Sequence, residues 1–191
     1  MMTSLFGDRM VSKADGRIRF RGLIDSLESE TIEAQVLANS LGEQYYCAAL
    51  GDVLGCLRAI MSAEVREAPF AMPCLFGLSA DELHRQTHDV KGAFGLAEHP
   101  LPDYRQGPLA ARLNTLRARI REAELCAVRV FIEGGGANHA DSANQVGLAS
   151  QSGPACCRAP RREDLPLALN RLSSALYWLY CRLVAGSRPR P

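Results

Sequence analysis

The sequence predicts an all-α protein, an up-and-down helical bundle of about five helices. Apolar residues recur at helical spacing over several segments of bundle length, and no segment has the strict alternation of a convincing strand. Connections are short before residue 134. With 191 residues, 47% of them hydrophobic, the chain is expected to form a single domain over residues 1–191 with a sizeable core.

Residues 1–19 are polar and lack periodicity, so we expect a structured loop that leads into the first helix. This is the most basic part of the chain, with Lys13, Arg17, Arg19 and the following Arg21. A solvated basic leader is the default interpretation, and phosphate binding is the alternative.

The first helix is expected over residues 20–41 and has two apolar stripes. The larger stripe comprises Phe20, Leu23, Leu27, Ala34, Ala38 and Leu41. The smaller, nearly opposite, comprises Asp25, Ser29, Ile32 and Val36. A helix that is apolar on two sides packs inside a bundle or between a bundle and another subunit. Asp25 would then need a cationic partner across the contact.

A second helix is expected from about residue 43 to residue 64, after Gly42. A capping box at Ser79 then starts a short helix that carries His84 and His88. Two histidines four residues apart can share a metal ion, but no third ligand follows at a recognised spacing. A polar surface or the edge of a substrate site is the favoured interpretation, and both histidines remain weak metal candidates.

The helix expected over residues 109–131 carries a pair of arginines beside its core face. Arg117, Arg121 and Glu124 follow one flank of the apolar face, which comprises Leu113, Leu116, Ile120, Ala127 and Phe131. Arginines can lay their aliphatic stems along a core and keep the charge in water. The alternative is an anion clamp for phosphate, which requires a second element.

The remaining chain contains an insertion and a last helix. Residues 134–160, including Cys156 and Cys157, have no apolar period, and we expect a flexible insertion. The last helix starts near Glu163 and carries a leucine stripe, flanked on one side by Asn170, Ser173 and Tyr177 and on the other by Arg171 and Trp178. Residues 186–191 are expected to be a disordered tail.

The overall charge and the cysteine content exclude several protein classes. A net charge of +1 provides no global field for nucleic acid or membrane surfaces, so any anion recognition must be local. The seven cysteines have no framework spacing, which favours reduced thiols. The N-terminus lacks a signal-peptide pattern, and no uninterrupted apolar run approaches membrane-spanning length. We therefore expect a cytoplasmic protein.

Three ordered motifs resemble the ATP:cob(I)alamin adenosyltransferases, and most closely their ethanolamine-utilisation branch. They are the segment from Met10 to Leu27 with Phe-Arg-Gly-x-x-Asp-Ser-Leu, the segment from Leu113 to Glu124, and the segment from Asp164 to Trp178 with Leu-Asn-Arg-Leu-Ser-Ser. Leu83-His-Arg-x-x-His88 adds to the signal for that branch. The resemblance covers nearly the whole chain except the insertion and the last residues.

The resemblance implies transfer of the 5′-deoxyadenosyl group of ATP to the cobalt of reduced corrinoid, giving adenosylcobalamin and triphosphate. Carried over by position, Arg121 contacts the ATP phosphates, and Asn170 holds the nucleotide. Arg117 pairs with Asp25, across a subunit contact, and Glu124 completes the Arg117 motif. Lys13, Arg171 and Ser173 are further nucleotide-binding candidates.

The resemblance also implies cofactors, partners and a location. ATP and cobalamin are expected as substrates with Mg²⁺, and a homodimer or homotrimer is expected, with active sites at subunit contacts. A corrinoid reductase and ethanolamine ammonia-lyase are the expected partners, in the cytoplasm and in association with a bacterial microcompartment. Members of this branch carry an N-terminal metal-binding region with a histidine and clustered cysteines. The sequence begins after that point, so we do not expect bound Fe or Zn. A corrinoid-binding or delivery protein without catalysis is the alternative.

Overall fold

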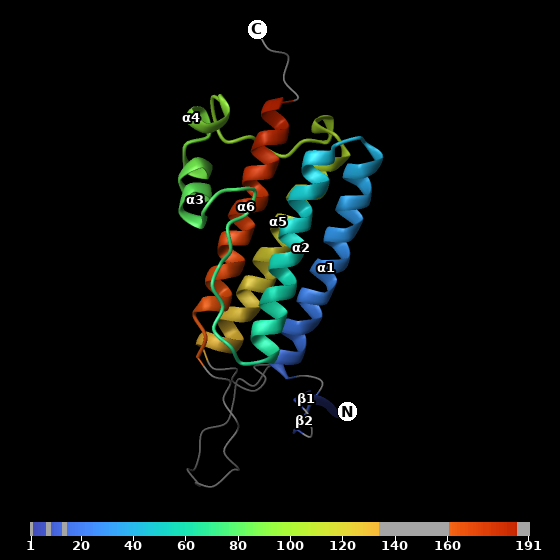
Figure 1. The fold of residues 1–191 in the computed structure, drawn as a ribbon, viewed down its shortest axis with the longest axis vertical. Helices are drawn as coiled ribbons and strands as arrows, with labels where there is room; N and C mark the ends of the chain where they lie inside the picture. The colour runs from blue at the N-terminus through green and yellow to red at the C-terminus, as the bar shows by residue number, and fades with distance from the viewer. Residues whose placement is uncertain (1, 7–8, 13–14, 134–160, 187–191) are drawn as a thin grey trace, which may run out of the picture.

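Four long helices lie side by side and form the bundle (Figure 1). In this computed structural model, residues 2–6, 9–12, 15–133 and 161–186 are described. The long helices are α1 (Gly16–Ser40), α2 (Gln44–Val65), α5 (Pro108–Ala127) and α6 (Asp164–Gly186). The predicted all-α bundle is confirmed, and the helices begin and end within a few residues of the predicted positions.

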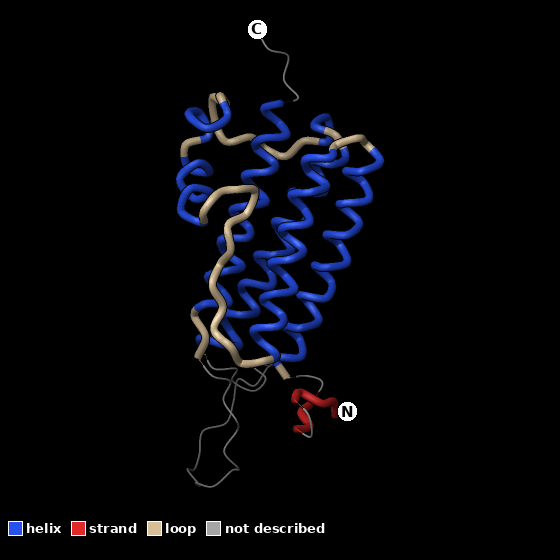
Figure 2. Tube along the Cα trace, in the orientation of Figure 1, coloured by secondary structure: helices blue, strands red, loops and turns tan. Residues whose placement is uncertain are grey.

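Neighbouring helices in the bundle are antiparallel, but α2 and α5, which are successive long helices along the chain, are parallel. Arg112 and Arg119 of α5 pair with Glu33 and Glu30 of α1, which fixes opposite directions for these two helices. Because α2 also runs opposite to α1, α2 and α5 point the same way. A crossover over residues 66–107 returns the chain to the other end of the bundle (Figure 2). This connection is longer than the sequence analysis expected.

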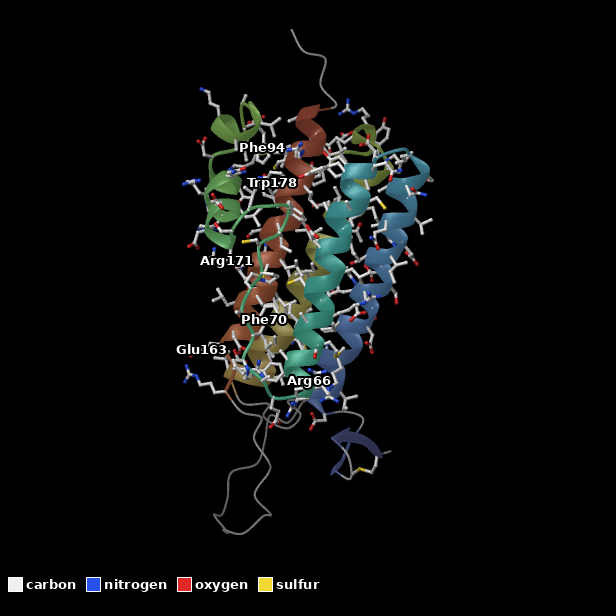
Figure 3. The ribbon with its side chains drawn as sticks, viewed as in Figure 1. Arg66, Phe70, Phe94, Glu163, Arg171 and Trp178 are labelled. Atoms are coloured by element: carbon white, nitrogen blue, oxygen red, sulfur yellow. The ribbon has the colours of Figure 1, made fainter. Side chains whose placement is uncertain are left out.

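The crossover packs against α6 through short helices and an aromatic cluster. It contains α3 (Ala80–His88), α4 (Val90–Phe94) and the 3₁₀ helix η1 (Tyr104–Gln106). The rings of Phe76 and Phe94 both lie 5.7 Å from the Trp178 ring, and Trp178 also donates a hydrogen bond to Gln86 at 2.7 Å (Figure 3). These contacts bind both halves of the crossover to α6.

The predicted core faces of α5 and α6 are buried, whereas Leu41 at the end of the predicted α1 stripe is 49% exposed. Leu113, Leu116 and Ile120 of α5 are inaccessible to solvent, and so are five residues of the α6 leucine stripe, Leu165, Leu169, Leu172, Leu176 and Leu179. A π-helical turn, Val128–Ile132, continues α5 and places Phe131 edge-on against Phe20 of α1, 5.2 Å between ring centres. Helix α2 is long and apolar enough to span a membrane, but half of its most apolar window is buried in the bundle, as in the core helix of a soluble protein.

The N-terminal segment differs from the expected loop. Residues Met2–Phe6 (β1) and Arg9–Ser12 (β2) form an antiparallel hairpin, and Asp15 then caps α1 by accepting the Arg17 backbone N–H at 2.8 Å. Helix α1 begins at Gly16, earlier than expected. A Cβ at this position would lie 2.8 Å from Cγ2 of Val130, so only glycine permits this approach of α1 to the end of α5.

Arg17 and Arg21 at the start of α1 are paired and largely buried, so the expected solvated leader is wrong for these two, whereas Arg19 is exposed as expected. Glu64 of α2 is inaccessible to solvent, and its two carboxylate oxygens accept from Nε of Arg17 at 2.5 Å and Nε of Arg21 at 2.6 Å. Arg17 also pairs with Glu67 at 2.8 Å. Sequence periodicity does not reveal this network, because Glu64 and Arg17 are 47 residues apart. Lys13, the insertion at 134–160 with Cys156 and Cys157, and the tail beyond Gly186 lie outside the described residues.

Candidate functional site

The outer flanks of α5 and α6 bring five of the polar residues on these helices together. We call this the α5–α6 seam and define it by Arg117, Arg121 and Glu124 of α5 with Asn170 and Tyr177 of α6. The Asn170 side-chain amide donates to the Glu124 carboxylate at 3.0 Å. The Arg117 guanidinium carbon lies 4.8 Å from the centre of the Tyr177 ring. Helix α6 therefore supplies the second element that an anion clamp on α5 requires.

The arginines of α5 divide by flank. Arg112 and Arg119 face α1 and form ion pairs with its glutamates. Arg121 points away from α1, is exposed, and has no hydrogen bond or ion pair with any residue that the structure describes. A guanidinium presents five N–H donors in a planar fork that matches phosphate oxygens. Arg121 is thus the seam cation whose donors are available to a ligand.

A polar and aromatic network surrounds Tyr177. Its hydroxyl is 2.8 Å from Nδ1 of His99, and its ring stacks on that of Tyr180 at 6.0 Å. The Tyr180 hydroxyl donates to the Gln106 side chain at 2.9 Å. Burial, assisted by a hydrogen bond with Cys181, raises the pKa of Tyr177 above its usual value, so its ring stays neutral at physiological pH. This network fixes one end of the seam.

Two other predicted nucleotide-binding residues lie outside the seam. Ser173 is buried, and its hydroxyl donates to the Asn170 backbone carbonyl at 2.8 Å. Arg171 lies on the flank of α6 that faces α3, with Nη2 4.0 Å from the Asp81 carboxylate (Figure 3). Arg171 follows Asn170 directly, so helical geometry turns its side chain about 100° away from the seam, whereas the Ser173 hydroxyl is taken up by the helix backbone.

The predicted Asp25–Arg117 pair is not formed within the described part of one chain. Asp25 is exposed on the outer face of α1, where Ile32 and Val36 of the same stripe are 43% and 65% exposed. This is the surface on which the sequence analysis expected a second subunit. Arg117 instead stacks on Tyr177. The pair therefore stays a prediction that concerns two copies of the chain.

The two weak metal candidates lie on an exposed face of α3. The rings of His84 and His88 are 4.4 Å apart between centres, which places both imidazoles on one side of the helix. Among the residues that the structure describes, no group of three or more histidine, cysteine, aspartate and glutamate side chains could hold a metal ion. Two imidazoles alone leave half of a tetrahedral site without protein ligands.

Tyr177 is the seam residue to which the sequence analysis gave no role. Its place on the Asn170 flank was visible from the spacing of seven residues, but a contact between Tyr177 and Arg117 joins two helices. Periodicity within one helix cannot show which residue of the next helix it meets. The resemblance of the Asp164–Trp178 motif named its neighbours and not Tyr177.

Comparison with known proteins gave one family. Residues 1–183 match the family model described as Cobalamin adenosyltransferase. A corrinoid adenosyltransferase EutT from Salmonella typhimurium is 33% identical over 184 residues, which cover 96% of this chain and 59% of the relative. A corrinoid adenosyltransferase EutT from Escherichia coli K12 is 31% identical over 176 residues, which cover 92% of this chain and 56% of the relative. The chain thus spans less than two thirds of the length of these relatives. No solved structure matches significantly.

Proposed function

Because the chain belongs to the cobalamin adenosyltransferase family, we propose that it transfers the 5′-deoxyadenosyl group of ATP to the cobalt of a reduced corrinoid. The products are adenosylcobalamin and triphosphate. The observation that carries this proposal is the exposed Arg121 guanidinium beside the Asn170–Glu124 pair. These three residues match the family motif by position and lie on adjacent helices.

The proposed chemistry requires positioning more than acid or base catalysis. Co(I) is itself a strong nucleophile and attacks the C5′ carbon of ATP, while the C5′–O bond breaks and the electron pair leaves with the triphosphate. The protein must hold C5′ in line with the cobalt and stabilise the charge that builds on the departing triphosphate. Arg121 is the residue that we assign to this charge.

The other seam residues bind and orient the nucleotide in this proposal. Asn170 holds the nucleotide, and Glu124 fixes the orientation of the Asn170 amide through the 3.0 Å hydrogen bond. Arg117 pairs with Asp25 of a second copy and completes the site at a subunit contact. Lys13 is a further candidate for the nucleotide. Arg171, which faces Asp81, and Ser173, whose hydroxyl donates to the Asn170 backbone carbonyl, are assigned supporting positions next to the seam.

Mg²⁺ would reach this site with the nucleotide. Magnesium in nucleotide sites is held by one or two carboxylates together with phosphate oxygens and water. Glu124 is a seam carboxylate that could take part, and its hydrogen bond to Asn170 uses one oxygen. The described residues provide no closed cluster of metal ligands, so phosphate oxygens and water would supply most of the magnesium ligands.

The proposed cellular context follows from the sequence resemblance. A homodimer or homotrimer in the cytoplasm would receive reduced cobalamin from a corrinoid reductase and supply ethanolamine ammonia-lyase. Association with a bacterial microcompartment belongs to the same proposal. The exposed apolar stripe of α1 supports the oligomer, since a monomer gains nothing from exposing Ile32 and Val36 together.

Anaerobic incubation with ATP, Mg²⁺ and chemically reduced cobalamin tests the activity. The expected product has a Co–C bond, and its absorption spectrum reverts in light. Triphosphate should appear in equal amount. Tight cobalamin binding without this product would favour the alternative, a corrinoid-binding or delivery protein. Absence of both product and ATP binding would exclude the adenosyltransferase.

A further inference from the structure

The Arg117 guanidinium has a clear partner in Tyr177, a residue to which the family resemblance assigns no role. We propose that Tyr177 is a positioning residue, whose ring holds Arg117 so that its N–H edge faces an oxyanion in the α5–α6 seam. The oxyanion belongs to the proposed function, on which this inference rests. It is either the triphosphate of the nucleotide or the Asp25 carboxylate of a second copy.

Arg117 of α5 and Tyr177 of α6 form a cation–π contact. Arg117 lies over the Tyr177 ring, 4.8 Å from guanidinium carbon to ring centre, within the range of a cation–π contact. Arg117 is half-buried and makes no ion pair with any other residue in the described ranges. A guanidinium that stacks by its face keeps the N–H donors at its edge free. In such a stack, the ring restricts the side chain without using the donors.

Tyr177 is itself held in place by its neighbours. Its hydroxyl is held by His99, which precedes η1, and its ring is stacked on Tyr180. Tyr180 is buried and anchored to Gln106 at the end of η1. The ring is thus held from α6 and from the segment that leads into α5. A fixed ring lowers the number of orientations that Arg117 must lose when it binds an anion.

The two arginines of the seam favour a bound anion. Arg121 follows Arg117 by one helical turn, so two positive charges lie on one flank of α5. Like charges at this spacing repel each other unless an anion lies between or beside them. Triphosphate oxygens and a carboxylate both accept hydrogen bonds from the planar edge of a guanidinium. Lysine would supply charge but neither the stack nor the two parallel donors.

The experiment compares Tyr177→Leu, which removes the ring, with Tyr177→Phe, which keeps it, in the full chain. In protein labelled with ¹⁵N-arginine, the Arg117 Nε–H resonance should carry a ring-current shift that is lost in Tyr177→Leu and kept in Tyr177→Phe. Tripolyphosphate affinity is measured by calorimetry, and the self-association constant by sedimentation. Tyr177→Leu should weaken either tripolyphosphate binding or self-association by about three- to tenfold.

A matched control is available on the other side of the bundle. Arg182 lies 4.4 Å from the centre of the Tyr45 ring and 5.5 Å from that of Trp178, so Tyr45→Leu removes the nearer of its two ring contacts, away from the seam. It should shift the Arg182 resonance and leave tripolyphosphate affinity unchanged. In an Arg117→Ala background, Tyr177→Leu should have no further effect, because its proposed role acts through Arg117.

Each outcome decides the proposal. Weakened tripolyphosphate binding identifies the nucleotide as the source of the oxyanion, and weakened self-association that disappears in Asp25→Asn identifies Asp25. An unshifted Arg117 resonance in Tyr177→Leu overturns the inference, as does an equal effect of Tyr177→Leu with and without Arg117. Wild-type protein that binds neither ATP nor tripolyphosphate contradicts the proposed function alone. The resonance and the self-association measurement then still decide the role of Tyr177.

Discussion

Glu64 shows what one buried carboxylate requires of its surroundings. It is inaccessible to solvent at the end of α2, and its two oxygens accept from Arg17 and Arg21 of α1. Arg17, only 5% exposed, also donates to the Glu64 backbone carbonyl at 3.1 Å. Burying such charges is costly unless each is paired, and removing one partner leaves the other uncompensated. The pairing therefore binds the start of α1 to the end of α2.

We predict that Glu64→Gln lowers the free energy of unfolding by about 3–5 kcal/mol, the cost of breaking a buried ion pair. Urea denaturation followed by circular dichroism measures this change. The control is Glu122→Gln, which removes the exposed ion pair with Arg119 at 2.5 Å. It should cost about 0.5 kcal/mol or less. Equal effects of the two substitutions would contradict the role given to burial.

In contrast to the buried and paired Arg17, Arg121 is exposed, and no described residue accepts a hydrogen bond from its guanidinium. We predict that Arg121→Ala leaves the urea midpoint nearly unchanged, because exposed side chains without partners contribute little to stability. The same substitution should lower kcat/KM for adenosylation about 100-fold or more, as expected for loss of a donor to a charge that develops in the transition state. The corrinoid assay under anaerobic conditions measures this effect.

The control for Arg121 is Arg129→Ala, an exposed arginine on another flank of the same continuous helix. It should retain near-normal kcat/KM. Arg121→Lys separates charge from geometry, since lysine keeps the charge and loses the planar fork. If Arg121→Ala and Arg129→Ala lower the activity equally, general loss of positive charge is the cause and the assignment of Arg121 fails.

The helices themselves were the most predictable elements. Spacing of apolar residues located the predicted helices and the core faces of α5 and α6, because burial of one stripe is what stabilises such a helix. The hairpin β1–β2 was missed because its strands are only five and four residues long and lack strict alternation of apolar and polar residues. The return of the crossover to the opposite end of the bundle was not predicted. Local periodicity contains no information on the end of a bundle at which the next helix begins.

The seam was predictable only in part. The resemblance supplied Arg121, Glu124 and Asn170, and in the structure Asn170 of α6 is hydrogen-bonded to Glu124 of α5, one turn after Arg121 on the same helix. The structure also turned Arg171 toward Asp81, because a residue next to Asn170 on a helix points about 100° away. Tyr177 and Glu64 were missed for one reason. Their partners lie on other helices, 60 and 47 positions away in the sequence for Arg117 and Arg17.

The start of α6 is held by an acid, and this makes its attachment sensitive to pH. Asp164 accepts from the Arg162 guanidinium at 2.7 Å and from the Phe70 backbone N–H at 2.8 Å. The Arg162 hydrogen bond, with help from Phe70, holds the pKa of Asp164 below its ordinary value. A depressed folded-state pKa stabilises the fold above the unfolded value, near pH 4, and this contribution is lost as pH falls through the folded value.

We therefore predict that the urea midpoint of the wild type falls between about pH 5 and pH 3, and falls less in Asp164→Asn. The stabilising contribution of the ionised carboxylate is already absent from that variant at every pH. Asp81→Asn is the control, since the Asp81 side chain is 94% exposed and 4.0 Å from its nearest arginine. Its pH profile should follow the wild type. Identical profiles for Asp164→Asn and the wild type would exclude this role.

At the scale of the whole molecule, the seam and the α1 stripe complement each other. Asp25, Ile32 and Val36 present an acidic and apolar surface on α1, while Arg117 and Arg121 present a basic one on α5. Arg112 and Arg119 lie between them in space and are already paired with α1 of the same chain. The unused charges on both surfaces support the proposed contact between copies, with the site at that contact.

A shared site can be tested by mixing two inactive variants. Asp25→Ala damages the α1 side of a contact, and Arg121→Ala damages the α5 side. We predict that each alone loses most activity, whereas an equal mixture, dissociated in mild urea and reassembled, regains about a quarter of wild-type activity in a dimer or a closed ring. The fraction is the chance that both sides of a given contact are intact, one half for each.

The reverse arrangement gives a different result. If one copy contained the whole site, every site in the mixture would carry one damaged residue, and activity would stay at the level of the separate variants. A mixture of Asp25→Ala with the Asp25→Ala/Arg121→Ala double variant provides the control, because no contact in it is intact on the α1 side. Recovery in the first mixture and none in the control would place Asp25 and Arg121 of different copies in one site. Equal activities in the two mixtures would place the site within a single chain.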